Sequence, residues 1–185
     1  MKDLKNSVAI ITGSSSGVGA ATAKLLAGEG CHVLINYNSN SAGAEAVAEE
    51  CRAMGVECLV FGGSVAEDAN CAAMATEAIE KWGRVDILVN NAGTTKFVDH
   101  SDLDGLSSDD FQRIYAVNVI GSYQMIRAVS EQMKSQEGGG AVVNVASTAA
   151  VTGIGSSVAY AASKGALVTM TLSLARALGP KLRIN

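Results

Sequence analysis

Short apolar runs alternate with longer amphipathic stretches along the whole chain of 185 residues. The short runs are rich in β-branched residues and predict five strands, at 8–12, 32–37, 57–62, 85–90 and 141–147. Between them, apolar positions recur at helical spacing and predict helices at 18–27, 43–54, 68–82, 108–135 and 158–178. Several strands are apolar along nearly their whole length, which is typical of a parallel sheet covered on both faces. The alternation predicts an α/β fold with a doubly wound parallel sheet in three layers.

The end of the chain carries one further strand signal. Pro180 stops the last predicted helix, and the segment KLRIN (181–185) begins what reads as a sixth strand. The glycine-rich segment SQEGGGA (135–141) reads as a loop between helix and strand rather than as a linker between domains. We therefore expect residues 1–185 to form a single domain that is incomplete at its carboxyl end.

Composition and charge argue against several classes of protein. A net charge of −4 without a basic block gives no electrostatic footprint for nucleic acid. No uninterrupted apolar run reaches the roughly 18 residues of a membrane span, and the amino-terminal segment does not fit a signal peptide, so we expect a cytoplasmic protein without a membrane anchor. The four cysteines show no CxxC spacing and the chain has only two histidines, so we expect reduced, partly buried thiols and no metal site.

The segment TGSSSGVG (12–19) lies between the first predicted strand and the first predicted helix. Gly13 permits a tight turn, Gly17 lets the backbone approach a pyrophosphate, and Gly19 allows the helix to pack closely on the sheet. The free N–H groups at the start of the helix would then face the phosphates. This pattern predicts a Rossmann-type dinucleotide site, although three glycines in a turn can also mean only a turn.

The end of the second predicted strand bears on which dinucleotide binds. Sites for NAD usually place Asp or Glu about 20 residues after the glycines, where the carboxylate accepts from the ribose 2′-OH. Here the segment INYNSNSAG supplies Asn36, Tyr37, Asn38 and Ser39 and no carboxylate. Because a 2′-phosphate would meet no repulsion there, the sequence favours NADP(H). NAD(H) stays possible, since no arginine is present in this segment.

The segment SSVAYAASKGAL (156–167) contains one tyrosine and one lysine among small residues. On a helix, Tyr160 and Lys164 lie one turn apart on the same face. A fixed ammonium stabilises a nearby phenolate, so the pair can act as a proton donor and acceptor. The small neighbours leave room for a cofactor and a substrate. Taken alone, an exposed pair without a chemical role is the simpler interpretation.

The ordered set of motifs resembles the classical short-chain dehydrogenase/reductase family over essentially the whole chain. The set consists of TGxxxGxG at 12–19, NNAG at 90–93, VNVIG at 117–121, Ser147, and YxxxK at 160–164. Five motifs in this order and at this spacing are highly specific. The resemblance implies hydride transfer between a nicotinamide cofactor and a small carbonyl or secondary alcohol substrate.

The resemblance also implies roles for individual residues. Tyr160 is expected to be the general acid/base, and Lys164 to assist it and bind the nicotinamide ribose. Ser147 is expected to hydrogen-bond the substrate oxygen, and Asn118 to hold a water in a proton relay through Lys164. The expected cofactor contacts are Gly13, Ser15, Ser16, Gly17, Val18, Gly19, Tyr37, Asn38, Ser39, Ser64, Val65, Asn91, Ala92, Gly93, Tyr160 and Lys164.

Two features depart from the family pattern. Members usually carry an aspartate after the third strand that binds the adenine amino group, whereas Ser64 stands there in this chain. We therefore expect looser adenine recognition, with the backbone at Val65 contributing. Family chains also continue past this point through a substrate-binding lid and a further strand, and commonly form dimers or tetramers. The resemblance thus implies that the full-length protein is a homo-oligomer.

Two alternatives remain beside the reductase or dehydrogenase. One is a nucleotide-binding regulatory or structural protein without catalytic activity, although such a protein need not retain all four of Asn118, Ser147, Tyr160 and Lys164. The other is an epimerase or dehydratase of the extended subfamily, whose glycine loop normally reads TGxxGxxG and does not fit TGSSSGVG.

Overall fold

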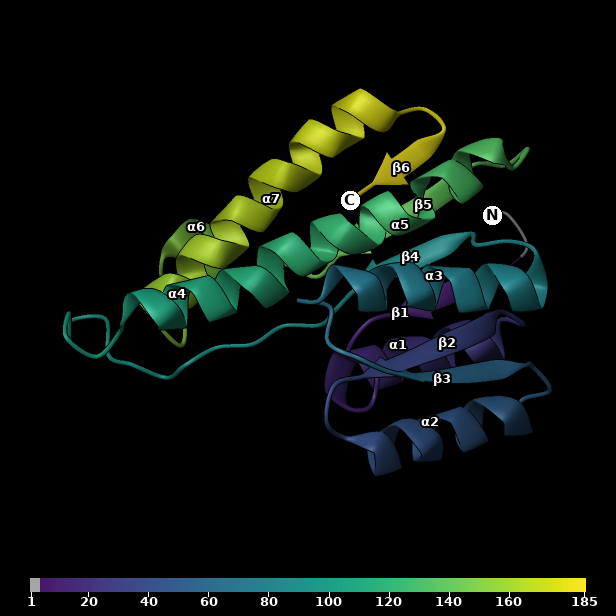
Figure 1. Ribbon diagram of the computed structural model, residues 1–185, viewed down its shortest axis with the longest axis horizontal. Coiled ribbons are helices and arrows are strands. Elements are labelled where there is room, and N and C mark those ends of the chain that lie inside the picture. Colours follow the sequence, from purple (N-terminus) through teal and green to yellow (C-terminus); the bar gives the residue numbers. More distant parts are fainter. Residues whose placement is uncertain (1–3) are drawn as a thin grey trace.

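A computed structural model of the protein describes residues 4–185, and their core is a six-stranded parallel sheet. The strands are β1 (Val8–Ile11), β2 (His32–Tyr37), β3 (Cys58–Gly62), β4 (Ile87–Asn90), β5 (Gly140–Asn144) and β6 (Leu182–Ile184). Their spatial order is β3-β2-β1-β4-β5-β6, and every neighbouring pair is parallel. Figure 1 shows this order from β3 near the bottom to β6 near the top. The predicted doubly wound sheet, including its sixth strand, is confirmed.

Helices follow the strands in alternation. They are α1 (Gly17–Gly28), α2 (Ser41–Ala53), α3 (Asp68–Trp82), α4 (Ser108–Tyr115), α5 (Ser122–Ser135), α6 (Ala149–Thr152) and α7 (Val158–Leu178). A π-helical segment, η1 (Ala116–Gly121), joins α4 to α5. The carboxyl ends of the strands lie on the left of Figure 1, where α4, α6 and the start of α7 gather.

Two apolar clusters cover the two faces of the sheet, because successive side chains of a strand point to opposite faces. On β1, Ala9 and Ile11 pack against α1 and α2, whereas Ile10 packs against α3 and α5. Helix α7 adds partly buried side chains to the cluster that contains Ile10. Over β5 the coverage is one-sided, since Val142 is fully buried while Val143 is 43% exposed. The layers are therefore α1 and α2, the sheet, and α3, α5 and α7.

The structure corrects several predicted boundaries. The helix predicted over 108–135 contains η1, in which the backbone hydrogen bonds take a wider register than in the flanking α4 and α5. The strand predicted over 141–147 is β5, which starts at Gly140 and ends at Asn144. Ser147 therefore lies in the connection after the strand, just before the unpredicted short helix α6. The strand predicted over 85–90 begins at Ile87.

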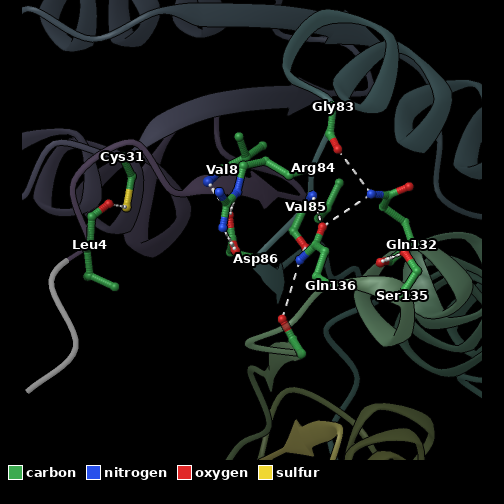
Figure 2. A network of polar contacts seen from close by, with 11 residues as sticks. Leu4, Val8, Cys31, Gly83, Arg84, Val85, Asp86, Gln132, Ser135 and Gln136 are labelled. Atoms are coloured by element: carbon green, nitrogen blue, oxygen red, sulfur yellow. Dashed lines mark hydrogen bonds and ion pairs between the residues drawn. The ribbon is translucent and has the colours of Figure 1, made fainter.

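A network of polar contacts lies at the amino-terminal ends of the strands (Figure 2). The carboxylate of Asp86 accepts hydrogen bonds from the backbone N–H of Val8 and from the guanidinium of Arg84. The amide of Gln136 bonds both backbone groups of Val85. These bonds tie β1 and β4 to the end of α5.

Helix α7 is the one candidate membrane span among the described residues, by length and composition alone. It runs for 21 residues with a mean hydropathy of 1.2 in its most apolar window. This is weak evidence, because the core helices of globular domains pass the same test. Here α7 packs through Leu174 and Leu178 on the apolar cluster that contains Val142 of β5 and Leu182 of β6.

Candidate functional site

A cavity of about 710 Å³ opens at the carboxyl edge of the sheet, where β1 and β4 lie side by side. The chain leaves these two strands in opposite directions, toward β2 and toward β5, and the crevice at such a switch point is the usual ligand site of doubly wound folds. Loops after four strands and one helical segment line it: Gly13, Ser15, Ser16, Asn36, Asn38, Ser39, Asn40, Gly63, Ser64, Val65, Ala66, Asn91, Ala92, Gly93, Thr94, Arg113, Ala116 and Val117.

Most of the predicted cofactor residues meet at this cavity. Those that line it are Gly13, Ser15, Ser16, Asn38, Ser39, Ser64, Val65, Asn91, Ala92 and Gly93. Gly17, Val18 and Gly19 begin α1 beside it without lining it. Tyr37 also lies outside the lining, with its ring packed against Gly62. Tyr160 and Lys164 lie on α7, beyond the NNAG segment.

The three glycines of the loop meet different physical requirements. Gly13 has φ of +61°, and a Cβ there would lie 2.9 Å from the Cα of Ala92. Gly19 has ordinary backbone angles, but a Cβ there would lie 2.5 Å from the Nδ2 of Asn91. Gly17 has φ of +56° and open space around it. Hence Gly13 and Gly19 are needed for close approach, and Gly17 for its backbone conformation.

The start of α1 offers unpaired backbone donors to the cavity. Ser16 is its N-cap residue, and no side chain of residues 4–185 accepts from the first turn at that position. The first N–H groups of an α-helix have no partner within the helix, and they carry the positive end of the helix dipole. Ser15 and Ser16 line the cavity directly before this helix. The arrangement suits an anionic group such as a pyrophosphate.

Thr12 joins the loops that follow β1 and β4. Its Oγ1 accepts from the backbone N–H groups of Asn91 and Ala92, each at 3.0 Å. In return, the side-chain amide of Asn91 donates to the carbonyls of Thr12 and Gly13, also at 3.0 Å. The glycine loop and the NNAG segment are therefore bonded to each other, and their geometry is fixed by the protein alone.

Asn36 performs a similar task on the other side of the glycine loop. It is only 2% exposed, and its Oδ1 accepts from the N–H of Gly13 at 3.0 Å. Its Nδ2 donates to the carbonyls of Gly63 at 2.9 Å and Phe61 at 3.3 Å. Because these bonds occupy its side chain, Asn36 has no free amide hydrogen to donate to a 2′-phosphate. Asn38 and Ser39, which are both exposed and line the cavity, could still contact such a phosphate.

Tyr160 and Lys164 lie in the first two turns of α7, on the helix that the sequence predicted. Ser157 caps this helix, since its Oγ accepts from the N–H of Tyr160 at 3.3 Å. Tyr160 is half-buried and Lys164 is 4% exposed, with its Nζ 5.7 Å from the centre of the tyrosine ring. The ammonium donates to the carbonyl of Val145 at 2.7 Å. Burial lowers the pKa of Lys164 below its ordinary value.

Gly93 connects this pair to the cavity. It lines the cavity, and a Cβ on it would lie 3.8 Å from the Nζ of Lys164 and 3.6 Å from the Oδ1 of Asn118. A ligand running along the NNAG segment would therefore reach the buried ammonium at Gly93. Gly93 therefore lies between the cavity and Lys164, and neither Lys164 nor Tyr160 lines the cavity itself.

The side chain of Asn118 is fully buried in η1 and is bonded on every side. Its Oδ1 accepts from the N–H of Thr94 at 2.8 Å, and its Nδ2 donates to the carbonyl of Thr94 and to the Oγ of Ser163, both at 3.0 Å. It thereby joins the segment after β4 to α7, next to Lys164. The π-helical register positions this side chain, because a widened turn shifts it relative to a regular helix.

Ser147 lies in the connection between β5 and α6, half-buried, with its Oγ accepting from the N–H of Ala149 at 3.1 Å. The next connection, between α6 and α7, contains Gly155, where a Cβ would lie 3.0 Å from that of Ala149 and 3.4 Å from the Cδ1 of Tyr160. Gly155 thus lies between the ring of Tyr160 and Ala149, the residue whose N–H donates to the Oγ of Ser147.

The sequence did not single out several residues that line the cavity. Asn40, Gly63, Ala66 and Thr94 each directly follow or precede a predicted contact, so their neighbours were the available signal. Ala116 and Val117 lie in or beside the VNVIG motif. The one without a local signal is Arg113, which α4 brings to the cavity from a distant part of the chain.

Comparison with known proteins gives a consistent result. The profile of the family described as short chain dehydrogenase matches residues 7–185. The 3-hydroxyacyl-CoA dehydrogenase type-2 of Rattus norvegicus is 38% identical over an alignment of 188 positions, which covers 97% of this chain and 70% of that protein.

Solved structures agree in fold. A short-chain dehydrogenase/reductase assigned in Burkholderia xenovorans superposes with a TM-score of 0.94 at 44% identity, covering 97% of this chain and 75% of that one. An NAD⁺-bound xylitol dehydrogenase superposes with a TM-score of 0.91 at 32% identity, covering 100% of this chain and 70% of that one. The chain therefore spans about 70–75% of the length of these relatives.

Proposed function

Since the chain belongs to the short-chain dehydrogenase family, we propose that it transfers a hydride between NADP(H) and a carbonyl or secondary alcohol substrate, with Tyr160 as general acid/base. The observation that carries this proposal is the continuity of the site. One cavity runs from the uncapped start of α1 to Gly93, and the buried ammonium of Lys164 and the ring of Tyr160 lie directly beyond it.

The residues around the cavity fit a nicotinamide dinucleotide. The N–H groups at the start of α1 would bind the pyrophosphate, and the loop of Ser64 and Val65 would contact the adenosine. Gly93, which lacks a side chain, would let the nicotinamide ribose approach Lys164. When bound, the cofactor supplies the hydride chemistry, and the protein supplies position and charge.

The chain's own residues then handle the proton. A cation at Lys164 stabilises a negatively charged phenolate at Tyr160, so the tyrosine hydroxyl can give a proton to a carbonyl oxygen or take one from an alcohol. Ser147, in the connection between β5 and α6, would donate to the same substrate oxygen. Asn118 would hold the segment of Thr94 against Ser163, the neighbour of Lys164. Because both hydrogens of its amide are already donated, it would keep a water of the proton relay in place through this framework and not through its own amide N–H groups.

The preference for NADP(H) rests on the rim of the cavity after β2. Asn38 and Ser39 line it there without a carboxylate that would repel a 2′-phosphate. A relative of similar fold is NAD⁺-bound, so NAD(H) is the second cofactor to test. Parallel titrations with NADPH and NADH measure the preference. Tighter binding of NADPH supports the proposal, and tighter binding of NADH contradicts it.

We also propose that residues 1–185 belong to one domain and that the full-length protein is a cytoplasmic homo-oligomer, a dimer or a tetramer. One sheet with a continuous apolar cluster on each face supports a single domain. Exposed apolar side chains on α7, including Val168 and Leu172, are consistent with a further packing partner. Light scattering on the full-length protein measures the number of subunits.

The central experiment compares Tyr160→Phe with the full-length wild type. Oxidation of NADPH and NADH is followed with a panel of ketones and aldehydes, and cofactor binding is followed by fluorescence. The variant should lose about 100-fold or more of turnover while it keeps its affinity for the cofactor. Tyr123→Phe, an exposed tyrosine on α5, is the matched control and should keep its turnover. Cofactor binding without turnover in the wild type would instead favour a nucleotide-binding protein without catalytic activity.

A further inference from the structure

Gly93 and Lys164 lie close together, although they come from distant parts of the chain. A Cβ on Gly93 would lie 3.8 Å from the Nζ of Lys164, so the backbone after β4 approaches the ammonium closely. Gly93 is exposed and lines the cavity, whereas Lys164 is 4% exposed. A ribose that rests on Gly93 and bonds to the ammonium would contact both residues. Its binding would therefore depend on how far apart they are held.

A chain of hydrogen bonds joins the residue after Gly93 to the residue before Lys164. The N–H of Thr94 donates to the Oδ1 of Asn118 at 2.8 Å, and the carbonyl of Thr94 accepts from the Nδ2 of Asn118 at 3.0 Å. The same Nδ2 donates to the Oγ of Ser163 at 3.0 Å. Three residues thus bridge Gly93 to Lys164, and Ser163 is the end of this bridge on α7.

The hydroxyl of Ser163 can take only one role in this bridge. It donates its own hydrogen to the carbonyl of Tyr160, one turn earlier in α7, at 2.7 Å. Its lone pairs are then left for the Nδ2 of Asn118, which can only donate. Ser163 and Asn118 are both 0% exposed, so bulk water does not replace either partner when the bond between them is lost.

Among residues 4–185, this bond is the one side-chain hydrogen bond between η1 and α7. Helix α7 also packs against α4 and η1, but apolar contacts are not directional and tolerate small shifts. Two further bonds, from Lys164 to Val145 and from Asn144 to Thr171, attach α7 to β5 and the segment after it. Neither of them reaches Thr94, so the position of α7 relative to the segment after β4 depends on Ser163.

We propose that Ser163 is a positioning residue that sets the separation of Gly93 and Lys164, and thereby how the nicotinamide ribose is held. This inference rests on the proposed function. Ser163 does not line the cavity, so it acts through Asn118 and Thr94 and not by contact with a ligand there.

The test compares the binding of ADP and ADP-ribose to the full-length protein by calorimetry. ADP-ribose carries the ribose that adjoins the nicotinamide in the whole cofactor, and ADP lacks it, so the ratio of the two Kd values reports the contribution of that ribose. Ser163→Ala leaves an amide hydrogen of Asn118 without a partner and removes the bond that holds α7. The ratio should fall by about 5-fold to 10-fold, while the Kd of ADP stays unchanged because its phosphates would bind at the start of α1.

Three further variants separate positioning from folding. Ser163→Thr keeps the hydroxyl and should restore the ratio. Ser163→Cys keeps the volume but offers a weak acceptor, so it should lower the ratio even if Ser163→Ala does not fold. Ser130→Ala is the matched control, because Ser130 is a buried serine of α5 whose hydroxyl also donates to a carbonyl one turn earlier and lies outside the bridge. Its ratio should equal that of the wild type.

Turnover gives a second measurement. With NADPH and a ketone that the wild type reduces, kcat should fall about 10-fold in Ser163→Ala and recover in Ser163→Thr, because a displaced cofactor lowers the rate of transfer. The KM for the ketone should change little, since the bridge lies on the side of the cofactor.

The outcomes are distinguishable from a failure of the proposed function. If the wild type binds neither NADPH nor NADH, the proposed function itself fails, and this inference fails with it. If the wild type binds and Ser163→Ala, folded by circular dichroism, keeps the ratio of the Kd values for ADP and ADP-ribose, the role of Ser163 is overturned. An equal loss of affinity for ADP and ADP-ribose would also overturn it, because a general distortion of the cavity would then be the cause.

Discussion

The ammonium of Lys164 donates to the backbone carbonyl of Val145 at 2.7 Å, which joins α7 to the segment that leaves β5. Lys164 is 4% exposed, so this contact replaces one of the hydrogen bonds to water that the three donors of the ammonium lose on folding. The same bond holds α7 in position relative to β5, and with it Tyr160. One hydrogen bond thus serves both the charge and the geometry of the site.

Raising the pH should stabilise the wild type relative to Lys164→Met. Burial lowers the pKa of Lys164 below its ordinary 10.5, so between the lowered value and 10.5 the unfolded chain binds a proton that the folded chain does not. The free energy of unfolding therefore rises with pH across that window, and the methionine variant lacks this contribution. Denaturant unfolding from about pH 7 to about pH 10.5 measures the difference. If the difference in free energy of unfolding between the wild type and Lys164→Met did not change with pH, the lowered pKa of Lys164 would be contradicted. Lys134→Met is the control at a surface lysine.

Replacing Gly13 and Gly17 by alanine should have unequal effects. Both glycines have positive φ, which costs a residue with a Cβ about 1–2 kcal/mol. At Gly17 the space is open, so the free energy of unfolding should fall by that amount alone. At Gly13 the new Cβ would also meet the backbone of Ala92 at 2.9 Å, so the loss should be larger. Thermal unfolding and NADPH affinity measure both effects, and equal losses would contradict the close approach of the two loops.

Much of this architecture follows from local patterns. The apolar runs gave the strands, because a parallel strand buried on both faces is apolar along its length. The glycine loop and the Tyr160–Lys164 spacing could be recognised in the sequence, since each depends on residues a few positions apart. The π-helical segment η1 could not be predicted, because the apolar period that predicts a helix is the same on both sides of a single widened turn.

The remaining parts of the site depend on contacts between distant segments. Asn36 reads as a polar residue at a strand end, and its role appears only when β3 brings the carbonyls of Phe61 and Gly63 beside it. Arg113 reads as a surface residue of an amphipathic helix, and only the packing of α4 against α7 brings it to the cavity. Such placements are set by tertiary structure, which residue periodicity does not encode.

Asn36→Asp should destabilise the protein more at neutral pH than at mildly acidic pH. The carboxylate would keep the acceptor for the N–H of Gly13, but it would face the carbonyls of Phe61 and Gly63 without a donor. Burial next to two carbonyls raises the pKa of the introduced acid, so the folded state binds a proton that the unfolded state has lost. The free energy of unfolding should therefore fall as the pH rises through about 4 and above. Unfolding at about pH 5 and about pH 7.5 measures this, and Asn38→Asp on the exposed rim is the control.

Thr171→Val should lower turnover and stability while leaving cofactor affinity nearly unchanged. The side-chain amide of Asn144 donates to the Oγ1 of Thr171 at 2.8 Å and accepts from Asn90 at 2.9 Å, so a buried polar chain links β4, β5 and α7. Valine keeps the shape of threonine but leaves a buried donor unpaired, which costs about 1–3 kcal/mol.

Thr171 lies two turns after Lys164 on the same face of α7. Among the residues that the structure describes, its loss leaves the bond of Lys164 to Val145 as the one side-chain hydrogen bond from this face to the end of β5. A small shift of α7 would move Tyr160 relative to the substrate, and reaction rates are sensitive to such shifts. The Thr171→Ser variant keeps the hydroxyl and should restore turnover. Equal turnover in all three proteins would show that the position of α7 is set by apolar packing alone.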